Sequence, residues 1–306
     1  MSFKITDNTK VYIAGCGGML GESVYQTFTD TKCTVKATDI NLTAPWLSYA
    51  DVSDYSEISK DIKSFAPDLI INLAALTDLE YCEKNQEQTW LYNALGPENI
   101  GLIANELDVP VVYISTAGIV DGKQDVYNDF DEVNPLSIYA KAKYHGEVFT
   151  QNHVRKFFVF RAGWMMGGGP GKDKKFVNKI YKQLKSGQKE LFVVDDKLGT
   201  PTYTKSFAKG ILEVVQSGLY GVYNQVCNGD CSRFDVAKEF VRLLGLEKDV
   251  KVTKVDSDYF KAEYFAPRPF SEKLVNLKLN ARGLNVMPDW QEALEDYSKV
   301  FIEDLA

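Results

Sequence analysis

The sequence predicts an α/β protein with a doubly wound parallel sheet and a smaller C-terminal lobe interleaved with that sheet. Short β-branched apolar runs alternate with helical stretches through the first half of the chain, as in successive βαβ units. The runs are apolar at consecutive positions, which is typical of strands covered on both faces. The chain has 306 residues, 45% of them hydrophobic and 25% charged, so it is large enough to bury a sizeable core.

The elements of the first half follow one another in a regular order. Five strands are expected, over residues 11–14, 34–38, 69–73, 111–115 and 157–161. Four helices are expected around them, over residues 20–28, 55–65, 89–107 and 137–152. Strands joined by helices pair in parallel, because each helix carries the chain back to the edge where the previous strand began.

The pattern loosens after about residue 163, where residues 167–171 contain four glycines and one proline. We expect helices over 174–185 and 207–216, strands over 191–194 and 221–226, and mixed structure over 233–244, 250–255 and 290–302. The resulting division places residues 1–165, with 200–226 returning to them, in the sheet domain. Residues 166–199 and 227–306 form most of a second, substrate-binding lobe.

Charge and composition exclude several classes of partner. The chain has 35 lysines and arginines against 42 aspartates and glutamates, a net charge of −7, and no basic stripe. Nucleic acid and anionic membranes are therefore poor partners. A small anionic ligand is still possible, because local backbone dipoles can bind one on an acidic protein. The first ten residues lack the apolar core of a signal peptide, and the longest apolar runs, such as 69–76, fall far short of the roughly 20 residues that span a bilayer. We expect a cytoplasmic protein.

The five cysteines have no spacing typical of a disulfide framework or a zinc site. Cys227 and Cys231 form the closest pair, and the chain has only two histidines to join them. We therefore expect free, mostly buried thiols and no metal.

A glycine-rich turn follows the first strand, with Gly15, Gly18 and Gly21 between that strand and the first helix. A bound dinucleotide needs glycines there: one for a turn closed to a Cβ, one for close approach to the pyrophosphate, and one for tight helix packing. The helix N-terminus adds free N–H groups, so Met19 and Leu20 are expected at the phosphates as well. The first domain is thus predicted to be a dinucleotide-binding Rossmann domain.

Carboxylates after the next two short runs extend this prediction. Asp39 ends the second strand, where a carboxylate accepts hydrogen bonds from the adenosine ribose and repels a 2′-phosphate. This favours NADH within the NAD(P)H pair, while Lys36 leaves NADPH open. Asp51, followed by Val52, is expected beside the adenine.

Tyr139 and Lys143 are four residues apart and share one face of an expected helix. An ammonium near a phenol favours phenolate, so we expect the lysine to lower the pKa of Tyr139 toward neutrality. The phenol can then pass its proton to a carbonyl oxygen as hydride reaches the carbon. Tyr181 and Lys185 have the same spacing but lie on a lysine-rich helix without a preceding strand.

The strand before Tyr139 ends in two hydroxyl residues, Ser115 and Thr116. The carboxyl edge of a parallel sheet is where ligands bind, so a hydroxyl there can bind the oxygen that Tyr139 protonates. Thr116 is the first choice and Ser115 the second. The structural alternative is that both hydroxyls only cap a loop.

Taken together, these features resemble the extended short-chain dehydrogenase/reductases that act on nucleotide sugars. Within that superfamily the chain is most similar to dTDP-4-dehydrorhamnose reductases over nearly its whole length. The stretches that carry the resemblance are residues 67–75, 93–97, 135–139, 161–164, 196–202 and 266–269. The last two, Asp-Lys-Leu-Gly-Thr-Pro-Thr and Ala-Pro-Arg-Pro, are the more specific ones.

The resemblance implies that the chain is an NAD(P)-dependent oxidoreductase. It would reduce the 4-keto group of a nucleotide-linked deoxysugar, in the biosynthesis of deoxysugar or polysaccharide precursors. Tyr139 would donate the proton, Lys143 would support it and hold the nicotinamide ribose, and Thr116 would bind the keto oxygen. Whether the protein is a monomer or a homodimer stays open.

The same resemblance implies roles for five further residues. Asn93 would lie in the cofactor region, and Ala74 and Ala75 would lie beside the nicotinamide. Trp164 and Arg268 would lie near the sugar or its diphosphate, since a guanidinium matches the geometry of a phosphate. A core position for Trp164 and a surface ion pair for Arg268 are the structural alternatives.

One stretch departs from the family pattern, in which an Asp-Tyr pair usually follows the threonine. Here Ala117 and Gly118 follow Thr116, which removes a carboxylate and a phenol from the substrate edge. The departure puts the rhamnose substrate in question and leaves the chemistry of Thr116, Tyr139 and Lys143 standing. An NAD-dependent sugar-nucleotide 4-epimerase and a non-catalytic dinucleotide-binding regulatory subunit are the alternatives.

Overall fold

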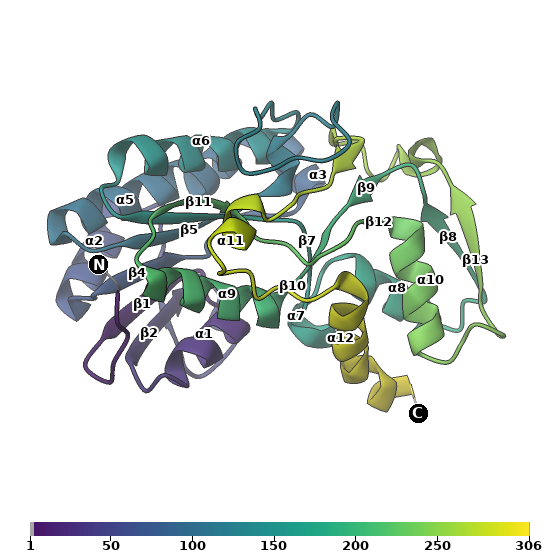
Figure 1. The fold of residues 1–306 in the computed structure, drawn as a ribbon, viewed down its shortest axis with the longest axis horizontal. Coiled ribbons are helices and arrows are strands. Elements are labelled where there is room, and N and C mark those ends of the chain that lie inside the picture. The colour runs from purple at the N-terminus through teal and green to yellow at the C-terminus, as the bar shows by residue number, and fades with distance from the viewer. Residues whose placement is uncertain (1–2, 306) are drawn as a thin grey trace.

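A seven-stranded sheet runs through the centre of the computed structural model, which describes residues 3–305 (Figure 1). Its strand order is β11-β6-β5-β4-β1-β2-β3, and every neighbouring pair is parallel. The strands are β1 (Lys10–Ala14), β2 (Thr34–Asp39), β3 (Leu47–Tyr49), β4 (Leu69–Asn72), β5 (Val111–Thr116), β6 (Phe157–Ala162) and β11 (Gly221–Asn224). The predicted doubly wound parallel sheet is confirmed. The order reverses between β1 and β4, the point at which such sheets bind their ligands.

Helices cover both faces of this sheet. On one face, α1 (Gly21–Thr29) and α9 (Thr204–Ser217) pack against Val11 and Ile13. On the other face, α2 (Tyr55–Phe65) and α5 (Gly96–Leu107) pack against Tyr12, with α6 (Ile138–His153) beside α5 (Figure 1). Neighbouring residues of β1 therefore point into two different cores, which explains why the sequence shows an unbroken apolar run.

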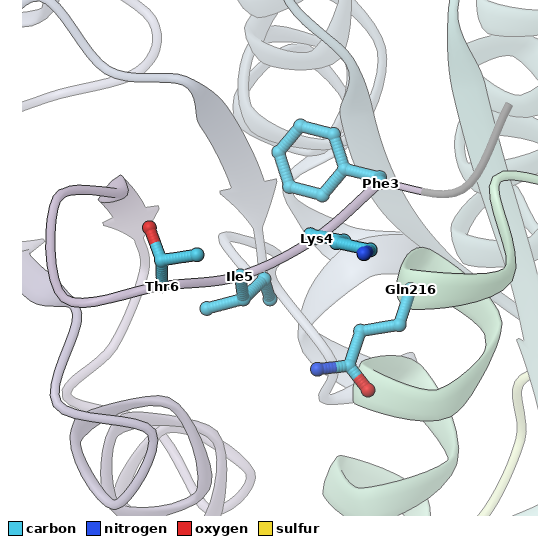
Figure 2. A pocket seen from close by; sticks show the side chains of 5 residues that line it. All are labelled: Phe3, Lys4, Ile5, Thr6 and Gln216. Carbon is cyan, nitrogen blue, oxygen red and sulfur yellow. The ribbon is translucent and has the colours of Figure 1, made fainter.

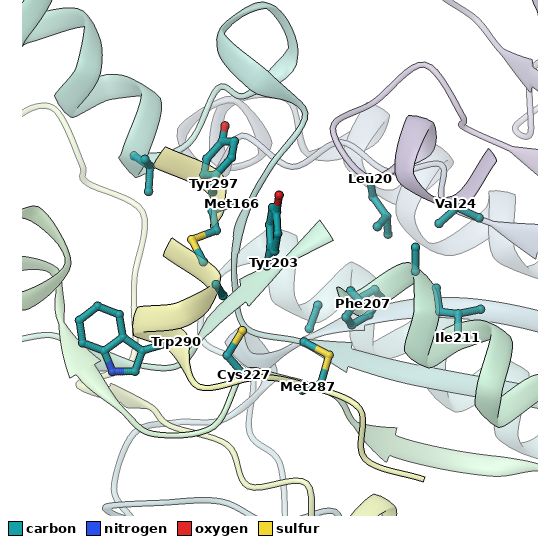
Figure 3. Packing of buried hydrophobic residues seen from close by; sticks show 14 of the residues in the cluster. Leu20, Val24, Met166, Tyr203, Phe207, Ile211, Cys227, Met287, Trp290 and Tyr297 are labelled. Carbon is teal, nitrogen blue, oxygen red and sulfur yellow. The ribbon is translucent and has the colours of Figure 1, made fainter. Parts of the chain in front are cut away.

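The core beneath α1 and α9 continues into the C-terminal lobe. Phe207 of α9 belongs to the same buried cluster as Tyr297 of α12 (Trp290–Leu305) (Figure 3). The buried Tyr297 hydroxyl lies 2.8 Å from Asp173 Oδ2 and 3.1 Å from the carbonyl oxygen of Gly167. Tyr297 thus ties the last helix to the glycine-rich segment around residue 168, and a Cβ on Gly168 would stand 3.1 Å from the carbonyl oxygen of Met19. This segment consequently lies against the predicted phosphate loop.

The helical stretch predicted over 89–107 begins earlier and is not uniform. It consists of α3 (Leu79–Lys84), α4 (Gln86–Trp90), a π-helical turn (Leu91–Leu95) and α5. A π turn contains one residue more than an α-helical turn and so rotates the helix after it. The turn carries Asn93, which is fully buried.

The part of the chain after β6 also forms small sheets and short helices outside the seven-stranded sheet. Its strands are β7 (Trp164–Met166), β8 (Glu190–Val194), β9 (Leu198–Gly199), β10 (Pro201–Tyr203), β12 (Cys231–Ser232), β13 (Lys251–Val255) and β14 (Ser271–Glu272). Its helices include α7 (Gly169–Lys172), α8 (Phe176–Lys185), α10 (Arg233–Leu243) and α11 (Leu277–Ala281). Strands of two or three residues leave no periodicity in a sequence, so of these only β8 matches a predicted strand, and β13 lies in a stretch that was expected to be mixed. The division of the chain into two lobes stays a prediction.

Two further properties follow from the described residues. The five cysteines are free and buried, as expected. Within residues 3–305 we find no helix with the length and apolar character needed to cross a membrane.

Candidate active site

The three glycines of the phosphate loop have three different surroundings. Gly15 has a φ of +73°, and a Cβ on it would stand 2.3 Å from the backbone of Ala74. A Cβ on Gly21 would stand 1.9 Å from the carbonyl oxygen of Cys16, so only glycine lets α1 begin this close to the turn. Gly18 is exposed, and the place of its Cβ is 3.8 Å from the nearest atom. Gly15 and Gly21 are thus required by the fold, whereas Gly18 leaves the backbone open to a ligand.

The N-terminus of α1 has the groups that a phosphate requires. Leu20 occupies the N-cap position, and no side chain caps it. The first N–H groups of the helix therefore lack a side-chain acceptor, and the helix dipole favours an anion there. Together with the open backbone at Gly18, this end of α1 fits the diphosphate of a dinucleotide.

Asp39 holds the phosphate loop from the end of β2. Its Oδ2 accepts a hydrogen bond from the N–H of Gly17 at 2.9 Å, and its Oδ1 accepts one from Asn41 at 2.8 Å. The carboxylate is thus placed at the loop, where the sequence predicted it. Lys36 does not share this position, because its ammonium pairs with Asp61 at 2.6 Å. The β2 strand turns this side chain toward the neighbouring α2, and NADPH stays open beside NADH.

Gly15→Ala is expected to destabilise the protein more than two comparable glycine variants. A positive φ costs a residue with a side chain about 1–2 kcal/mol, and contact with the Ala74 backbone adds to that cost. Gly187 also has a positive φ, +87°, but nothing lies within 4 Å of its Cβ position, and Gly171 has neither strain nor a neighbour. In urea denaturation, the free energy of unfolding should be lowest for Gly15→Ala, intermediate for Gly187→Ala and highest for Gly171→Ala. Equal stability of the first two variants would show that the Ala74 contact has no effect.

Four further residues expected at the cofactor lie in loops that hydrogen bonds and close packing hold in place. Asp51 Oδ1 accepts hydrogen bonds from the N–H and hydroxyl of Ser53 at 2.8 and 2.7 Å. Asn93 donates to the carbonyl oxygen of Leu76 and accepts from the N–H of the same residue. Ala74, whose N–H donates to Asn72 Oδ1 at 3.1 Å, lies against Gly15, and Ala75 follows it in the same loop. A direct role of these residues at the cofactor stays a prediction.

Tyr139 and Lys143 stand in the first turns of α6, and Tyr139 reaches Thr116. The Ser137 hydroxyl caps the helix by accepting from the N–H of Ala140 at 3.1 Å, which fixes where α6 begins. The Thr116 side chain, at the end of β5, lies close enough to the Tyr139 phenol to lower its pKa. Thr116 Oγ1 also accepts from the N–H of Gly118 at 3.1 Å. The predicted tyrosine and threonine are thus brought together.

Ser115 takes a different place. It is buried, and its hydroxyl has no hydrogen-bond partner within residues 3–305. Successive side chains of a strand point to opposite faces, so Ser115 and Thr116 cannot both face Tyr139. Of the two hydroxyls, the geometry favours Thr116.

The electrostatics of this pair differ from the expectation. Lys143 is only 4% exposed, and its ammonium lies 4.3 Å from the centroid of the Tyr113 ring. Burial lowers the pKa of Lys143 to about 7. Burial also raises the pKa of Tyr139 to about 12, against a lowering by the Thr116 side chain. The expected drop of the tyrosine pKa toward neutrality is therefore wrong for the protein alone, because burial destabilises both charged forms.

A buried ion pair lies one turn further along α6. Glu147 is fully buried, and its Oε1 is 2.6 Å from the guanidinium of Arg161 on β6. The negative charge of Glu147 raises the pKa of Lys143 and so opposes part of the effect of burial. The pair therefore helps Lys143 to keep a proton.

Trp164 is half-buried, and its ring lies on the backbone of Gly199, where a Cβ would stand 2.3 Å from it. Its Nε1 donates to Glu272 Oε2 at 2.5 Å. The guanidinium of Arg233 lies 3.7 Å from the ring centroid, which is a cation–π contact. Trp164 thus contacts both an acidic residue, Glu272, and a basic residue, Arg233. Neither was predicted from the sequence. The capping box of α10, formed by Ser232 and Asp235, could have placed Arg233 at a helix start, but nothing in the sequence marks Glu272.

Arg268 is occupied by protein groups. It pairs with Glu80 at 2.7 Å and donates to the carbonyl oxygen of Ala266 at 2.9 Å. The ion-pair alternative therefore describes its contacts in the protein. The second Tyr-x-x-x-Lys pair lies apart from the site on α8, where Tyr181 is buried 4.6 Å from the ring of Phe301.

A separate pocket of about 390 Å³ lies away from these residues (Figure 2). It is lined by Phe3, Lys4, Ile5, Thr6 and Gln216. Four of these residues lead into the amino end of β1, whereas the loop at Gly15 and Thr116 follow the carboxyl ends of their strands. Lys4 is the titratable side chain of the lining, and no carboxylate or thiol accompanies it there.

Comparison with known proteins covers nearly the whole chain. The model of the RmlD substrate binding domain family matches residues 9–302. A dTDP-4-dehydrorhamnose reductase of Mycolicibacterium smegmatis is 30% identical over 291 residues, which cover 94% of this chain and 84% of the relative. The crystal structure of a dTDP-4-dehydrorhamnose reductase of Clostridium acetobutylicum matches with a TM-score of 0.87 at 31% identity, covering 95% of this chain and 99% of that one. That of Bacillus anthracis, in complex with NADP, matches with a TM-score of 0.87 at 28% identity, covering 97% and 99%.

Proposed function

The chain belongs to the RmlD substrate binding domain family, and on that premise we propose that it uses NAD(P)H to reduce the 4-keto group of a nucleotide-linked deoxysugar. The first candidate substrate is dTDP-4-dehydrorhamnose, for which the relatives are named. One observation carries the proposal: Thr116, at the carboxyl end of β5, lies close enough to the Tyr139 phenol for its side chain to lower the pKa of that phenol, and Tyr139 stands one helical turn from the buried Lys143.

The proton of the reaction comes from Tyr139. Bound NAD(P)H supplies the hydride that goes to C4 of the sugar. The pKa of about 12 keeps the phenol protonated at neutral pH, so the proton is available on the Tyr139 hydroxyl. A sugar alkoxide is a stronger base than a phenolate, so transfer of this proton to the keto oxygen is favourable. The Thr116 hydroxyl orients the same oxygen, and water restores the proton to Tyr139 afterwards.

Lys143 stabilises the negative charge that Tyr139 carries after it has donated its proton. Within residues 3–305 its ammonium makes no hydrogen bond or ion pair, and its nearest partner is the Tyr113 ring. Three N–H donors are thus free for the hydroxyls of the nicotinamide ribose. A protonated Lys143 also stabilises the phenolate that remains when Tyr139 has given up its proton.

Asp39 supports a preference for NADH within this function. Its carboxylate stands at the phosphate loop, where a charge repels a 2′-phosphate. The Bacillus anthracis relative is in complex with NADP, so both cofactors need to be measured. We expect kcat/KM to be higher with NADH than with NADPH, and equal or reversed values would remove Asp39 as the discriminating residue.

The purified protein should oxidise NAD(P)H only when a 4-keto sugar nucleotide is present. The measurement is the loss of nicotinamide absorbance with dTDP-4-dehydrorhamnose, with its UDP- and GDP-linked counterparts, and without acceptor. Absence of turnover with every one of these ketones would overturn the proposal. A 4-epimerase would instead purify with bound cofactor and interconvert sugars without net oxidation, and a regulatory subunit would bind cofactor without any turnover.

A further inference from the structure

A carboxylate reaches the proposed catalytic residues from a distant part of the chain. Glu272 lies on β14, which pairs with β9, and it is half-buried. Its Oε2 accepts the indole N–H of Trp164 at 2.5 Å. Its Oε1 lies 3.4 Å from the point where a Cβ on Gly118 would stand, and Thr116 Oγ1 lies 3.5 Å from the same point. Glu272 therefore faces the threonine hydroxyl across the space that Gly118 leaves empty.

The charge of Glu272 acts on groups to either side of it. It raises the pKa of Tyr139, and it also raises the pKa of Arg233, which burial lowers to about 10. Arg233 lies over the ring of Trp164, whose indole holds the carboxylate in place. The carboxylate of Glu272 thus lies close enough to the phenol of Tyr139 and to the guanidinium of Arg233 for its charge to act on both.

One oxygen of this carboxylate is left over. Oε2 has its hydrogen bond from Trp164, but Oε1 makes none within residues 3–305. A carboxylate accepts hydrogen bonds and donates none, so the free oxygen can be satisfied only by a donor such as water or a hydroxyl. A group that served only to fix Trp164 would not need its second oxygen turned toward Gly118.

We propose that Glu272 determines substrate specificity, its Oε1 accepting a hydrogen bond from the sugar hydroxyl on the carbon next to the keto group. This inference rests on the proposed function, which places the keto oxygen at Tyr139 and Thr116. The neighbouring hydroxyl then projects beside that oxygen, on the side where Gly118 has no side chain. The absence of a carboxylate directly after Thr116 is thus offset by Glu272, which approaches the same space from the opposite side.

The test compares Glu272→Gln with wild type on two substrates. One is a dTDP-linked 4-keto-6-deoxysugar with a hydroxyl at C3, and the other is its 3-deoxy counterpart. A hydrogen bond to a charged group is worth about 1.5–3 kcal/mol, so the variant should lose about 10- to 150-fold in kcat/KM on the hydroxylated sugar. On the 3-deoxy sugar it should stay close to wild type. An equal loss on both sugars would overturn the proposal.

Trp164→Phe separates a bracing role from direct recognition. It removes the indole N–H but keeps the ring beneath Arg233 and the charge of Glu272. If Glu272 acts on the hydroxyl, Trp164→Phe should discriminate between the two sugars as wild type does, with a lower rate on both. If Glu272 only fixes Trp164, the two variants should show the same profile, and the proposal fails.

A binding measurement tests the role of Glu272 independently of the proposed function. Should wild type turn over no ketone, the proposed function fails, and calorimetry with dTDP-rhamnose and with dTDP then decides the role of Glu272. The proposal stands if Glu272→Gln weakens binding of the sugar nucleotide at least about tenfold and leaves dTDP binding unchanged. It falls if both ligands respond alike.

Discussion

Tyr139→Phe is expected to lower kcat by about 10²- to 10⁴-fold, the usual contribution of a positioned general acid. The substitution removes the phenolic proton that the proposed reaction delivers to the keto oxygen. It keeps the aromatic ring and therefore the packing of the first turns of α6, so NAD(P)H affinity and the unfolding midpoint should stay close to wild type. Stopped-flow measurement of hydride transfer, with cofactor binding measured separately, distinguishes loss of chemistry from loss of binding.

A matched control for this variant exists in the same chain. Tyr181→Phe alters the tyrosine of the second Tyr-x-x-x-Lys pair, which lies on α8 away from Thr116. It should leave kcat near the wild-type value. The assignment of Tyr139 as proton donor would be contradicted if Tyr139→Phe kept most of its activity, or if the two variants lost equal activity.

The sheet domain could be predicted from sequence because its signals are local. Runs of four or five apolar residues, each followed by a helix, suffice to predict β1, β4 and β5 and the parallel order that helical crossovers impose. The glycines between β1 and α1 and the four-residue spacing of Tyr139 and Lys143 are local in the same sense. Predictions of this kind were confirmed for the fold and the family.

Features that depend on burial or on distant contacts could not be predicted in this way. The sign of the change in the Tyr139 pKa depends on how much water the fold removes, which no spacing records. The ion pair of Lys36 could not be foreseen either, because its partner, Asp61, lies on the following helix. Glu272 stands on a two-residue strand more than a hundred positions after Gly118, so only the folded lobe reveals that they meet.

Lys143→Met is expected to reduce activity strongly and yet stabilise the cofactor-free protein at acidic and neutral pH. Loss of the hydrogen bonds that we propose Lys143 donates to the cofactor should lower kcat/KM by about 10- to 150-fold. The gain in stability follows from burial: methionine has a similar unbranched shape, and no charge has to be removed from water. Glu147, whose charge favours the protonated lysine, keeps its partner Arg161 in the variant.

The pH dependence of the stability difference identifies the lysine as its cause. The pKa of Lys143 is about 7 in the folded protein against 10.5 when unperturbed, so between these values the unfolded chain binds more protons. Linkage then requires wild-type stability to rise with pH across this window, and the full penalty to be present below about pH 7. The advantage of Lys143→Met in urea denaturation, on the order of a few kcal/mol, should therefore be largest at about pH 6 and shrink by about pH 9. An advantage that does not change with pH would mean that packing, rather than the buried charge, sets the stability of the variant.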